Sequence, residues 1–402
     1  MYADLDESSF EFHLKTHLVF GTGSALSLAD RLEEMRYRRI GVVVDPAVES
    51  SAYGKRILEG FHGKSFDDIR TWVYDVRGEP DYDSLDRVSP LFRGSGGTRG
   101  MDCFVGIGGG SVIDFAKGLA TLATNPGKAI RYRGFPKELL PSLPVIAIPT
   151  TAGTGSEVTY NAVFIDREEK RKLGINTFHN FPALAILDPH LIVSAPPSVL
   201  VSSGIDSLVH AVESFATRGS NPLTRIFARE AISCTFPALS GVLAEPGNRA
   251  ILSNLQMGAY LAGISLMNSG SGPAGALSYP LGVRFRVPHG LAGGVFLPGV
   301  VAHNVARGFD YSSLCDAICA EPAAPRERQE RSKKFSILLE QLSQKLGIPK
   351  DLGAFGVNKG NAGPLLRDVG SLGAAFAQNP VEFTVEDGKR MVLSMIEGDQ
   401  EA

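Results

Sequence analysis

We predict that the chain folds as an α/β N-terminal domain, residues 1–196, followed by an all-α C-terminal domain, residues 197–402. In the first half, short runs rich in β-branched residues alternate with helix-like stretches, a pattern typical of a parallel sheet. Several of these runs are apolar at successive positions, as in strands that helices cover on both faces. From about residue 197 the apolar residues follow a helical period instead.

Five runs are expected to form the strands of a doubly wound sheet. They are HLVF ending at residue 20, RIGVVVD at 39–45, TWVYDV at 71–76, CFVGIG at 103–108 and PVIAIP at 144–149. In the second half, SVLVSSGIDSLVHAVESFA and AILSNLQMGAYLAGISLM predict long helices. Residues 93–100 are expected to form a flexible loop, and the charged, proline-broken segment 320–334 a solvated connector between two helices.

The composition favours a protein that binds a small molecule. The 40 basic and 43 acidic residues are well mixed along the chain. We therefore expect no strongly charged surface that would attract nucleic acid or a membrane. The four cysteines are few, and only Cys315 and Cys319 are close in sequence, at a spacing that fits one helix face; reduced thiols are expected. The N-terminus does not resemble a signal peptide, and no run approaches the ~18 apolar residues of a spanning helix. We therefore expect a cytoplasmic protein.

The glycine-rich segment VGIGGGSVIDFAK, residues 105–117, predicts a phosphate-binding turn between a buried strand and a helix. Glycines let the backbone approach a ligand closely, and the N-terminus of a helix favours an anion. Such turns also occur where packing alone demands them. The segment is not the GxGxxG motif of Rossmann folds, because Ser111 stands where the third glycine would be.

Two further turns and one acidic residue support a dinucleotide. FGTGS at 20–24 and PTTAGTGSE at 149–157 both follow strand-like runs, and the second interleaves hydroxyls with glycines. Asp45 ends the strand-like run GVVVD, where a carboxylate can accept hydrogen bonds from both ribose hydroxyls and would repel a 2′-phosphate. That predicts NAD over NADP. The alternative is that Asp45 forms a turn before Pro46.

With these motifs, the chain resembles the iron-containing (group III) alcohol dehydrogenase family over nearly its whole length. The ordered segments are GGGSVIDFAK, PTTAGTGSEVT, LDP at 187–189, GIDSLVHAVES, LSYPLG and VPHGLAGGVFLPGVVAHN. The resemblance implies a dehydroquinate synthase-like fold in which a dinucleotide-binding domain and a helical domain flank the active site. It also implies that Gly108, Gly109, Gly110, Ser111 and Asp114 line the pyrophosphate site, and that Thr150, Thr151, Thr154 and Ser156 lie on the nicotinamide side. We also expect a homodimer.

A metal site is predicted in the second half. Asp206 and His210 are four residues apart, so on a helix they share one face and could bind one divalent ion. An Asp–His hydrogen bond at that spacing is the alternative. The resemblance assigns both residues as ligands and makes His289, in VPHG, the last metal-binding histidine.

Two histidines typical of the family are missing here. Where the family has H-x-x-x-H-P-L-G, this chain has Gly275 and Tyr279. The resemblance gives the first of these histidines to the metal and the second to the proton path. Three protein ligands plus water is a normal arrangement for zinc, so a site for iron or zinc remains possible with Asp206, His210 and His289 alone.

Tyr279 could replace the missing histidine as proton donor to a nascent alkoxide. Because a tyrosine hydroxyl ordinarily has a pKa of about 10, a nearby cation or metal would have to lower it. Alternatively, Tyr279 is an ordinary aromatic of the cleft. Arg284 and Arg286 would lie on one side of an extended segment and suit a carboxylate, phosphate or phosphonate on the substrate; they could equally be surface residues.

We therefore expect an NAD-dependent alcohol dehydrogenase or aldehyde reductase that transfers hydride to or from a primary alcohol/aldehyde pair, with an anionic substrate favoured. One alternative is a nucleotide-binding relative that lost its chemistry with the two histidines. Sister enzymes that use this fold for a metal-dependent cyclisation or for glycerol phosphate are disfavoured, because the ordered segments match the alcohol dehydrogenases better.

Overall fold

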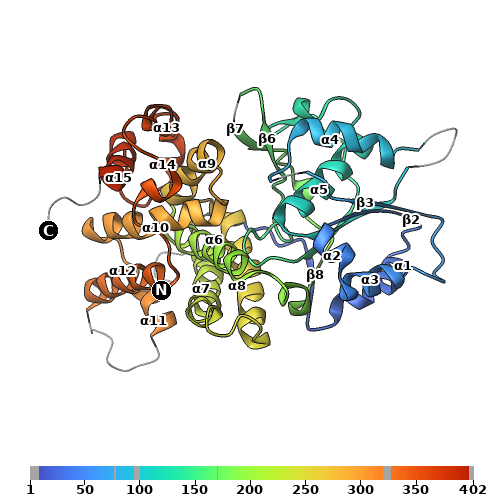
Figure 1. The fold of residues 1–402 in the computed structure, drawn as a ribbon, viewed down its shortest axis with the longest axis horizontal. Coiled ribbons are helices and arrows are strands. Elements are labelled where there is room, and N and C mark those ends of the chain that lie inside the picture. The colour runs from blue at the N-terminus through green and yellow to red at the C-terminus, as the bar shows by residue number, and fades with distance from the viewer. Residues whose placement is uncertain (1–8, 77, 95–99, 170, 320–326, 398–402) are drawn as a thin grey trace. The chain divides into compact units, whose positions relative to one another are not determined.

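The computed structural model describes residues 9–76, 78–94, 100–169, 171–319 and 327–397, which form two compact units. The α/β unit comprises residues 14–151 and 155–195. The helical unit comprises residues 196–402 together with 1–13 and 152–154, as far as these are described. The chain therefore passes from the helical unit into the α/β unit and back (Figure 1).

A six-stranded parallel sheet forms the centre of the α/β unit, in the order β1-β8-β5-β4-β2-β3. The strands are β1 (His17–Phe20), β2 (Arg39–Val44), β3 (Asp68–Val73), β4 (Cys103–Gly108), β5 (Val145–Pro149) and β8 (Leu184–Leu187). The predicted parallel sheet is confirmed. β3 starts and ends three residues earlier than expected, because its register pairs Asp68 with Arg39 at the start of β2. β8 was missed because its four apolar residues give too short a signal.

Helices cover both faces of this sheet, as the doubly wound prediction requires (Figure 1). On one face, α1 (Leu28–Glu34) and α3 (Ala52–Glu59) pack on strand residues such as Val42 and Val105. On the other face, α4 (Tyr82–Val88) and α5 (Gly110–Thr124) pack on strand residues such as Val43 and Phe104. Because successive residues point to opposite faces, β2, β4, β5 and β8 are buried almost throughout.

Smaller elements complete the unit. β6 (Val163–Asp166) and β7 (Arg171–Gly174) pair as an antiparallel ribbon, which the sequence did not predict. The short helix α2 (Pro46–Ser50) directly follows β2. Residues 95–99, within the expected loop at 93–100, lie outside the described residues.

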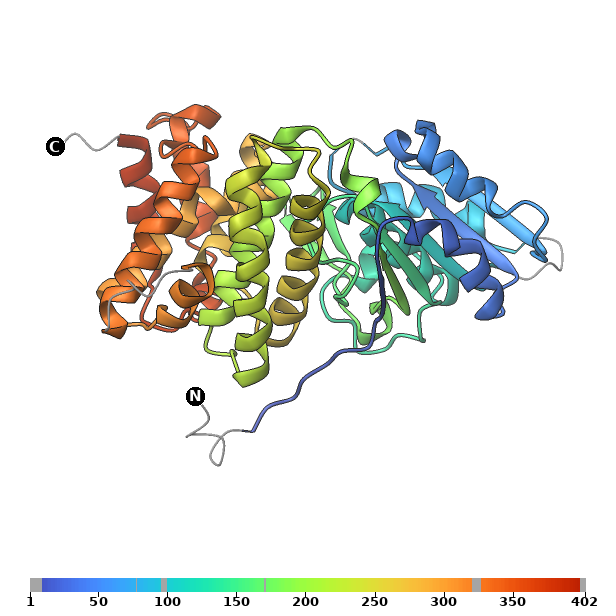
Figure 2. The same ribbon diagram turned by 90° about the horizontal axis from the view of Figure 1, so that it is seen from below.

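The helical unit is built around one buried helix. Its helices are α6 (Pro197–Ala216), α7 (Pro222–Val242), α8 (Arg249–Ser269), α9 (Pro273–Phe285), α10 (His289–Ala306), α11 (Ser312–Ile318), α12 (Arg328–Lys345), α13 (Ala362–Val369), α14 (Gly373–Phe376) and α15 (Val385–Glu397). Every residue of α6 from Gly204 to Ala216 is buried, and the helix packs against α7, α8, α9 and α10. The yellow-green helices α6, α7 and α8 lie side by side in Figure 2.

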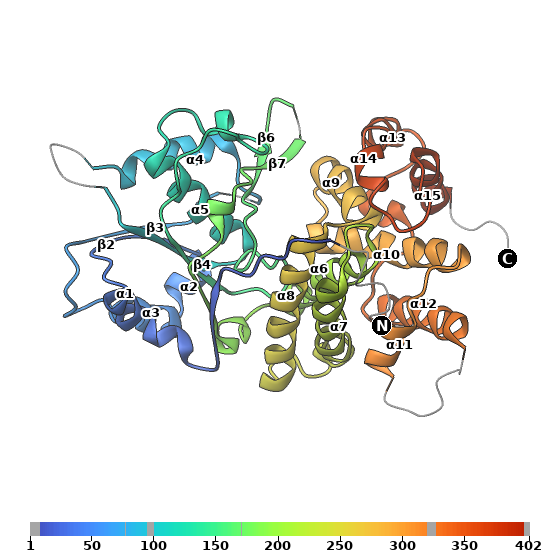
Figure 3. The same ribbon diagram turned by 180° about the vertical axis from the view of Figure 1, so that it is seen from behind.

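The N-terminal segment is tied to this unit. Phe12 stacks on Phe227 of α7, with ring centroids 5.6 Å apart. The backbone N–H of His13 donates to Asn268 Oδ1 of α8 at 2.6 Å, and Asn268 Nδ2 donates back to the carbonyl of His13 at 3.0 Å. Figure 3 shows this segment passing α8. These contacts explain why residues before Leu14 group with the helices.

One expectation about the second half needs correction. α12 begins at Arg328, so the connector predicted over 320–334 ends earlier, while residues 320–326 lie outside the described residues. The charged run becomes helical because it continues into Phe335, Leu339 and Leu342, which form a buried face.

Among the described helices, α8 is long and apolar enough to cross a membrane by length and composition, and 56% of its most apolar 18-residue stretch is buried. Such burial is typical of a core helix.

The cysteines behave as expected from their spacing. Cys103, Cys234, Cys315 and Cys319 are all free thiols. Cys319 follows directly after the last residue of α11, and its Sγ lies 3.7 Å from that of Cys315.

Candidate functional site

The glycine loop connects β4 to α5. Gly109 precedes the first helical residue, Gly110, and no side chain caps this helix terminus. A Cβ on Gly108 would lie 2.6 Å from Val112, so glycine is required there for α5 to fold back onto the strand. A Cβ on Gly109 would lie 3.4 Å from Thr151. Packing thus explains Gly108, whereas the uncapped terminus leaves first-turn N–H groups that suit a phosphate.

The threonine loop follows β5 next to this turn. The backbone N–H of Thr150 donates to the carbonyl of Gly108 at 3.0 Å, and both Thr150 and Thr151 are partly exposed. The structure therefore brings these two residues, Ser111 and the three glycines to the same end of the sheet. Thr154 is exposed and groups with the helical unit.

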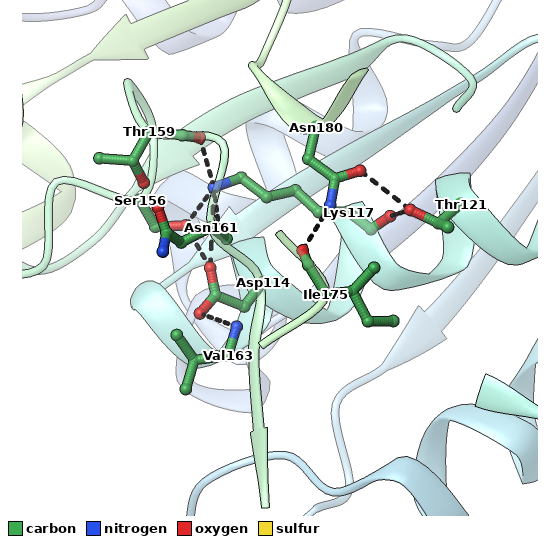
Figure 4. Close-up of polar contacts among 9 residues, drawn as sticks. All are labelled: Asp114, Lys117, Thr121, Ser156, Thr159, Asn161, Val163, Ile175 and Asn180. Carbon is green, nitrogen blue, oxygen red and sulfur yellow. Dashed lines mark hydrogen bonds and ion pairs between the residues drawn. The ribbon is translucent and has the colours of Figure 1, made fainter. Parts of the chain in front are cut away.

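Asp114 and Ser156 point toward each other beside Lys117 (Figure 4), and the Asp114 side chain is 13% exposed and Ser156 3%. The Ser156 hydroxyl donates to Oδ1 of Asp114, and the backbone N–H of Val163 donates to Oδ2 at 2.9 Å. Both Asp114 oxygens therefore have protein partners. These bonds tie the first turns of α5 to the segment that follows the threonine loop, so the two residues hold the predicted nucleotide loops in place.

Lys117, one turn further along α5, completes this buried cluster. Its side chain has no solvent exposure, and Nζ donates to Ser156 Oγ, the Thr159 carbonyl and the Asn161 carbonyl at 2.8–2.9 Å. Three acceptors match the three N–H bonds of a protonated ammonium. Burial lowers the pKa of Lys117 to about 8. Our sequence analysis gave Lys117 no role, although it lies in the glycine-rich motif.

Burial also shifts the pKa values of two carboxyl groups in the cluster. Burial raises the pKa of Asp114 above its usual range, against the opposing charge of Lys117 3.7 Å away. Burial also raises the pKa of Glu157 to about 7. The low dielectric of the site disfavours every charge in it, so the hydrogen bonds are what keep it together.

Asp45 adopts the turn-forming arrangement that was the alternative for it. It caps α2 by accepting the backbone N–H of Ala47 at 2.8 Å, and its own N–H donates to the Ile107 carbonyl at 2.8 Å. The side chain remains partly exposed. A role at the ribose hydroxyls stays a prediction.

The FGTGS turn is held by Asp188, a fully buried residue of the LDP segment. Its carboxylate accepts the backbone N–H groups of Gly23 and Ala25, both at 3.1 Å, and the hydroxyl of Tyr53. Gly21 and Gly23 have φ of 148° and 88°, which favour glycine. Sequence reasoning quoted LDP as a motif but did not foresee this anchoring role.

The three predicted metal ligands lie together in the helical unit. Asp206 and His210 are one turn apart on α6, and His289 is the first residue of α10. One ligand atom of each lies within 4.8 Å of the others. The Nε2 atoms of His210 and His289 lie 3.7 Å and 3.8 Å from Oδ1 of Asp206. These distances are too long for the hydrogen bond considered as the alternative.

The donor set fits a divalent metal. In a tetrahedral zinc site with bonds of about 2.1 Å, neighbouring ligand atoms are about 3.4 Å apart, close to the spacing around Asp206. One carboxylate and two imidazoles suit zinc or iron(II). His210 is 8% exposed, and its Nδ1 is buried without a hydrogen-bond partner.

Glycine at position 290 lets α10 approach α6 closely enough for His289 to reach Asp206. A Cβ on Gly290 would lie 2.0 Å from the Ser202 carbonyl oxygen and 2.7 Å from Cβ of Asp206. A Cβ on Gly294, one turn later, would lie 2.3 Å from the side chain of Ile205. Gly290 therefore cannot be replaced without moving one helix, whereas at Gly294 the Ile205 side chain would have to shift. From the sequence, only His289 of the PHGLAGG segment was predicted to have a role, and the close helix contact at Gly290 was missed.

Glu213 fixes α9 against the same helix. This buried carboxylate accepts the backbone N–H groups of Gly272, Ala274 and Gly275 at 2.6–3.0 Å and the hydroxyl of Ser271 at 2.8 Å. Burial raises the pKa of Glu213 despite these bonds. A Cβ on Gly275 would lie 2.3 Å from Ser271 Oγ. The position where the family has a histidine is therefore packed for glycine.

The structure places Tyr279 beside the cluster and changes the expectation for the two arginines. The ring centroids of Tyr279 and His289 are 5.2 Å apart, and Tyr279 is 37% exposed.

The segment that holds Arg284 and Arg286 is not extended. Arg284 lies in the last turn of α9, and Arg286 ends that helix in a left-handed conformation, φ 55°. Arg284 pairs with Asp368 of α13 through two bonds, one of 2.8 Å. Arg284 and Arg286 therefore do not lie in an extended segment, and their alternation gives no reason to place both on one side.

Comparison with known proteins places the whole chain in one family. Residues 15–189 match the family model described as iron-containing alcohol dehydrogenase, and residues 200–395 match the one described as the C-terminal part of the Fe-containing alcohol dehydrogenase family. Lactaldehyde reductase of Escherichia coli strain K12 is 30% identical over 373 residues, covering 92% of this chain and 94% of that protein.

Solved structures share the fold over nearly the full length. A 1,3-propanediol oxidoreductase is 25% identical with a TM-score of 0.88, covering 96% of this chain and all of its own. Sulfoacetaldehyde reductase from Bifidobacterium kashiwanohense, in complex with NAD+, is 25% identical with a TM-score of 0.86, covering 98% of this chain and all of its own.

Proposed function

The chain belongs to the iron-containing alcohol dehydrogenase family and is an NAD-dependent oxidoreductase acting on alcohols or aldehydes, and we propose that it works through a metal site of three protein ligands. The observation that carries this proposal is the convergence of Asp206, His210 and His289 within 4.8 Å. NAD and a divalent metal are the cofactors of this family.

In the proposed reaction, Asp206, His210 and His289 hold the ion, which polarises the substrate oxygen when bound. The uncapped terminus of α5 binds the pyrophosphate, and Asp114, Lys117 and Ser156 keep the surrounding loops in position. NAD bound there would exchange a hydride with the carbon of the alcohol/aldehyde pair.

Tyr279 donates the proton to the alkoxide that forms when an aldehyde is reduced. Its ring neighbours His289, and its partial exposure gives the proton a route to solvent. Tyr279→Phe should lower kcat by about 10²- to 10⁴-fold, with a changed pH profile. Unchanged kcat would leave Tyr279 an ordinary aromatic of the site.

An anionic substrate is our finer proposal. Sulfoacetaldehyde, the substrate named for one solved relative, carries a sulfonate, and Arg286 is exposed at the end of α9 near the Tyr279 turn. Because Arg284 is paired with Asp368, Arg286 is the better candidate to bind such a group. Arg286→Ala should lower kcat/KM for a sulfonated or carboxylated aldehyde roughly tenfold more than for a neutral one of equal length.

The deciding experiment follows nicotinamide absorbance with a panel of alcohols and aldehydes, neutral and anionic, in protein loaded with iron or zinc. Metal content is measured in parallel for the wild type, Asp206→Ala and His289→Ala. We expect NAD-dependent turnover in the wild type and loss of metal in both variants. Unchanged metal content in both would refute the ligand assignment, and NAD binding without turnover would support a nucleotide-binding relative that lost its chemistry.

We further propose that the protein is a homodimer located in the cytoplasm. Size measurement in solution would check the oligomeric state.

A further inference from the structure

The two imidazoles of the metal cluster have different surroundings. Nδ1 of His289 lies 3.0 Å from the hydroxyl oxygen of Ser278, a residue of α9 that is 1% exposed. Nδ1 of His210 is buried and makes no hydrogen bond with the described part of the chain. In both histidines Nε2 is the atom near Asp206. Only His289 therefore has a side chain that can orient its ring from behind.

The direction of the Ser278–His289 hydrogen bond follows from counting protons. The Ser278 hydroxyl donates to the carbonyl of Gly275 at 2.6 Å, one turn earlier in α9. A serine hydroxyl has one proton to donate, so toward His289 its oxygen can only accept. Nδ1 of the neutral imidazole must then carry the proton. Its lone pair is left on Nε2, the atom that faces Asp206.

We propose that Ser278 is a positioning residue that fixes His289 in the tautomer and orientation needed to bind the metal through Nε2. The proposal rests on the proposed function, because it takes His289 as a metal ligand. It also gives α9 a new role in this chain. The helix offers no side-chain ligand at Gly275, yet it supports the site indirectly through a hydroxyl three residues later.

The expected size of the effect follows from other metal sites. A ligating histidine generally donates its second N–H to a neighbouring acceptor, and loss of that acceptor typically weakens metal binding about 10- to 100-fold. Ser278 is well placed to have this effect, because its side chain is held by α9 itself and is shielded from water that could replace it.

The test compares Ser278→Ala with Ser271→Ala as a matched control. Ser271 is another hydroxyl, two residues before the same helix, but it donates to Glu213 and not to an imidazole. Metal-free protein of each is titrated with zinc against a chromophoric chelator. The tautomer of His289 is read from long-range ¹H–¹⁵N spectra of protein labelled on histidine, with the peak assigned through His289→Ala. Thermal unfolding checks that all variants fold.

We expect the wild type to show His289 protonated on Nδ1. Ser278→Ala should bind zinc about 10- to 100-fold more weakly and lose the single Nδ1–H form, while Ser271→Ala should differ from wild type less than threefold in affinity. Equal zinc affinity of Ser278→Ala and wild type, or a wild-type His289 protonated on Nε2, would overturn the proposal. If wild type took up no metal, or His289→Ala bound it equally well, the proposed metal site itself would fail, and with it this role of Ser278.

Discussion

Two buried clusters of charged residues differ in how their polar atoms are used. In the α/β unit, Lys117 donates all three of its N–H bonds to protein acceptors, and both oxygens of Asp114 accept protein hydrogen bonds. In the helical unit, the candidate ligand atoms of Asp206, His210 and His289 lie within 4.8 Å of one another. Nε2 of each histidine is too far from Oδ1 of Asp206 for a hydrogen bond, and Nδ1 of His210 has no partner among the described residues. The first cluster is held together by hydrogen bonds among its own members, whereas the members of the second lie at the spacing that our proposed metal ion would bridge.

The comparison predicts different effects of removing a charged group from each cluster, and the largest concerns activity. Asp206→Asn should lower kcat/KM by roughly 10³-fold or more, because a bound metal contributes several kcal/mol to the transition state and each 1.36 kcal/mol is tenfold in rate. The free energy of unfolding of the metal-free protein should change little. Denaturation of metal-free protein by urea, alongside steady-state kinetics, measures both. Strong destabilisation of the metal-free variant would show that Asp206 belongs to the structural kind of cluster.

Lys117→Met should act on stability. The change leaves the Asp114 carboxylate buried beside an apolar side chain, and breaking one partner of a buried ion pair costs about 3–5 kcal/mol of unfolding free energy. The double variant Asp114→Asn with Lys117→Met should recover a large part of that loss, because no charge is left unpaired. Urea unfolding of the wild type, the two single variants and the double variant tests this. Additive losses in the double variant would contradict a pairing of the two charges.

Gly290→Ala should separate α10 from α6 and thereby open the metal cluster. Relief of a 2.0 Å approach to the Ser202 carbonyl requires a backbone shift, for which overpacked cores typically lose about 1–3 kcal/mol of stability. Zinc affinity should fall about tenfold as His289 moves from Asp206. Gly293→Ala is the matched control on the same helix, since its Cβ would make an ordinary 3.4 Å contact with Val209. Equal zinc affinities of the two variants would show that Gly290 does not set the position of His289.

Glu157→Gln should change how the stability depends on pH. Burial raises the pKa of Glu157 from 4.5 to about 7, so the folded state holds this proton when the unfolded state has lost it. Its contribution to stability is therefore fully present below pH 4.5 and is lost as the pH rises to about 7. Relative to Glu157→Gln, the wild type should lose up to a few kcal/mol across this window. Parallel stability profiles of the two proteins between pH 4.5 and 7.5 would contradict the shift.

Much of the fold was predictable because its signals are local. The run CFVGIG gave β4 with its bounds, and successive apolar residues gave the buried strands of a doubly wound sheet. Periodicity gave α6 and α8. Short elements without a strong local pattern, such as β8 and the β6–β7 ribbon, were missed. The segment from Arg328 was mistaken for a connector, because its charges masked a helix whose apolar face begins only at Phe335.

The sequence by itself determined the glycine turn after β4 and the Asp206–His210 pair, because each depends on residues close together in the chain. Only the tertiary structure decided which polar groups are satisfied. It turned Asp114 and Ser156 inward onto Lys117, paired Arg284 with Asp368, and set Ser278 behind His289. Hydrogen bonds and close glycine contacts between separate elements depend on distances of a few tenths of an ångström, which no pattern along the chain encodes.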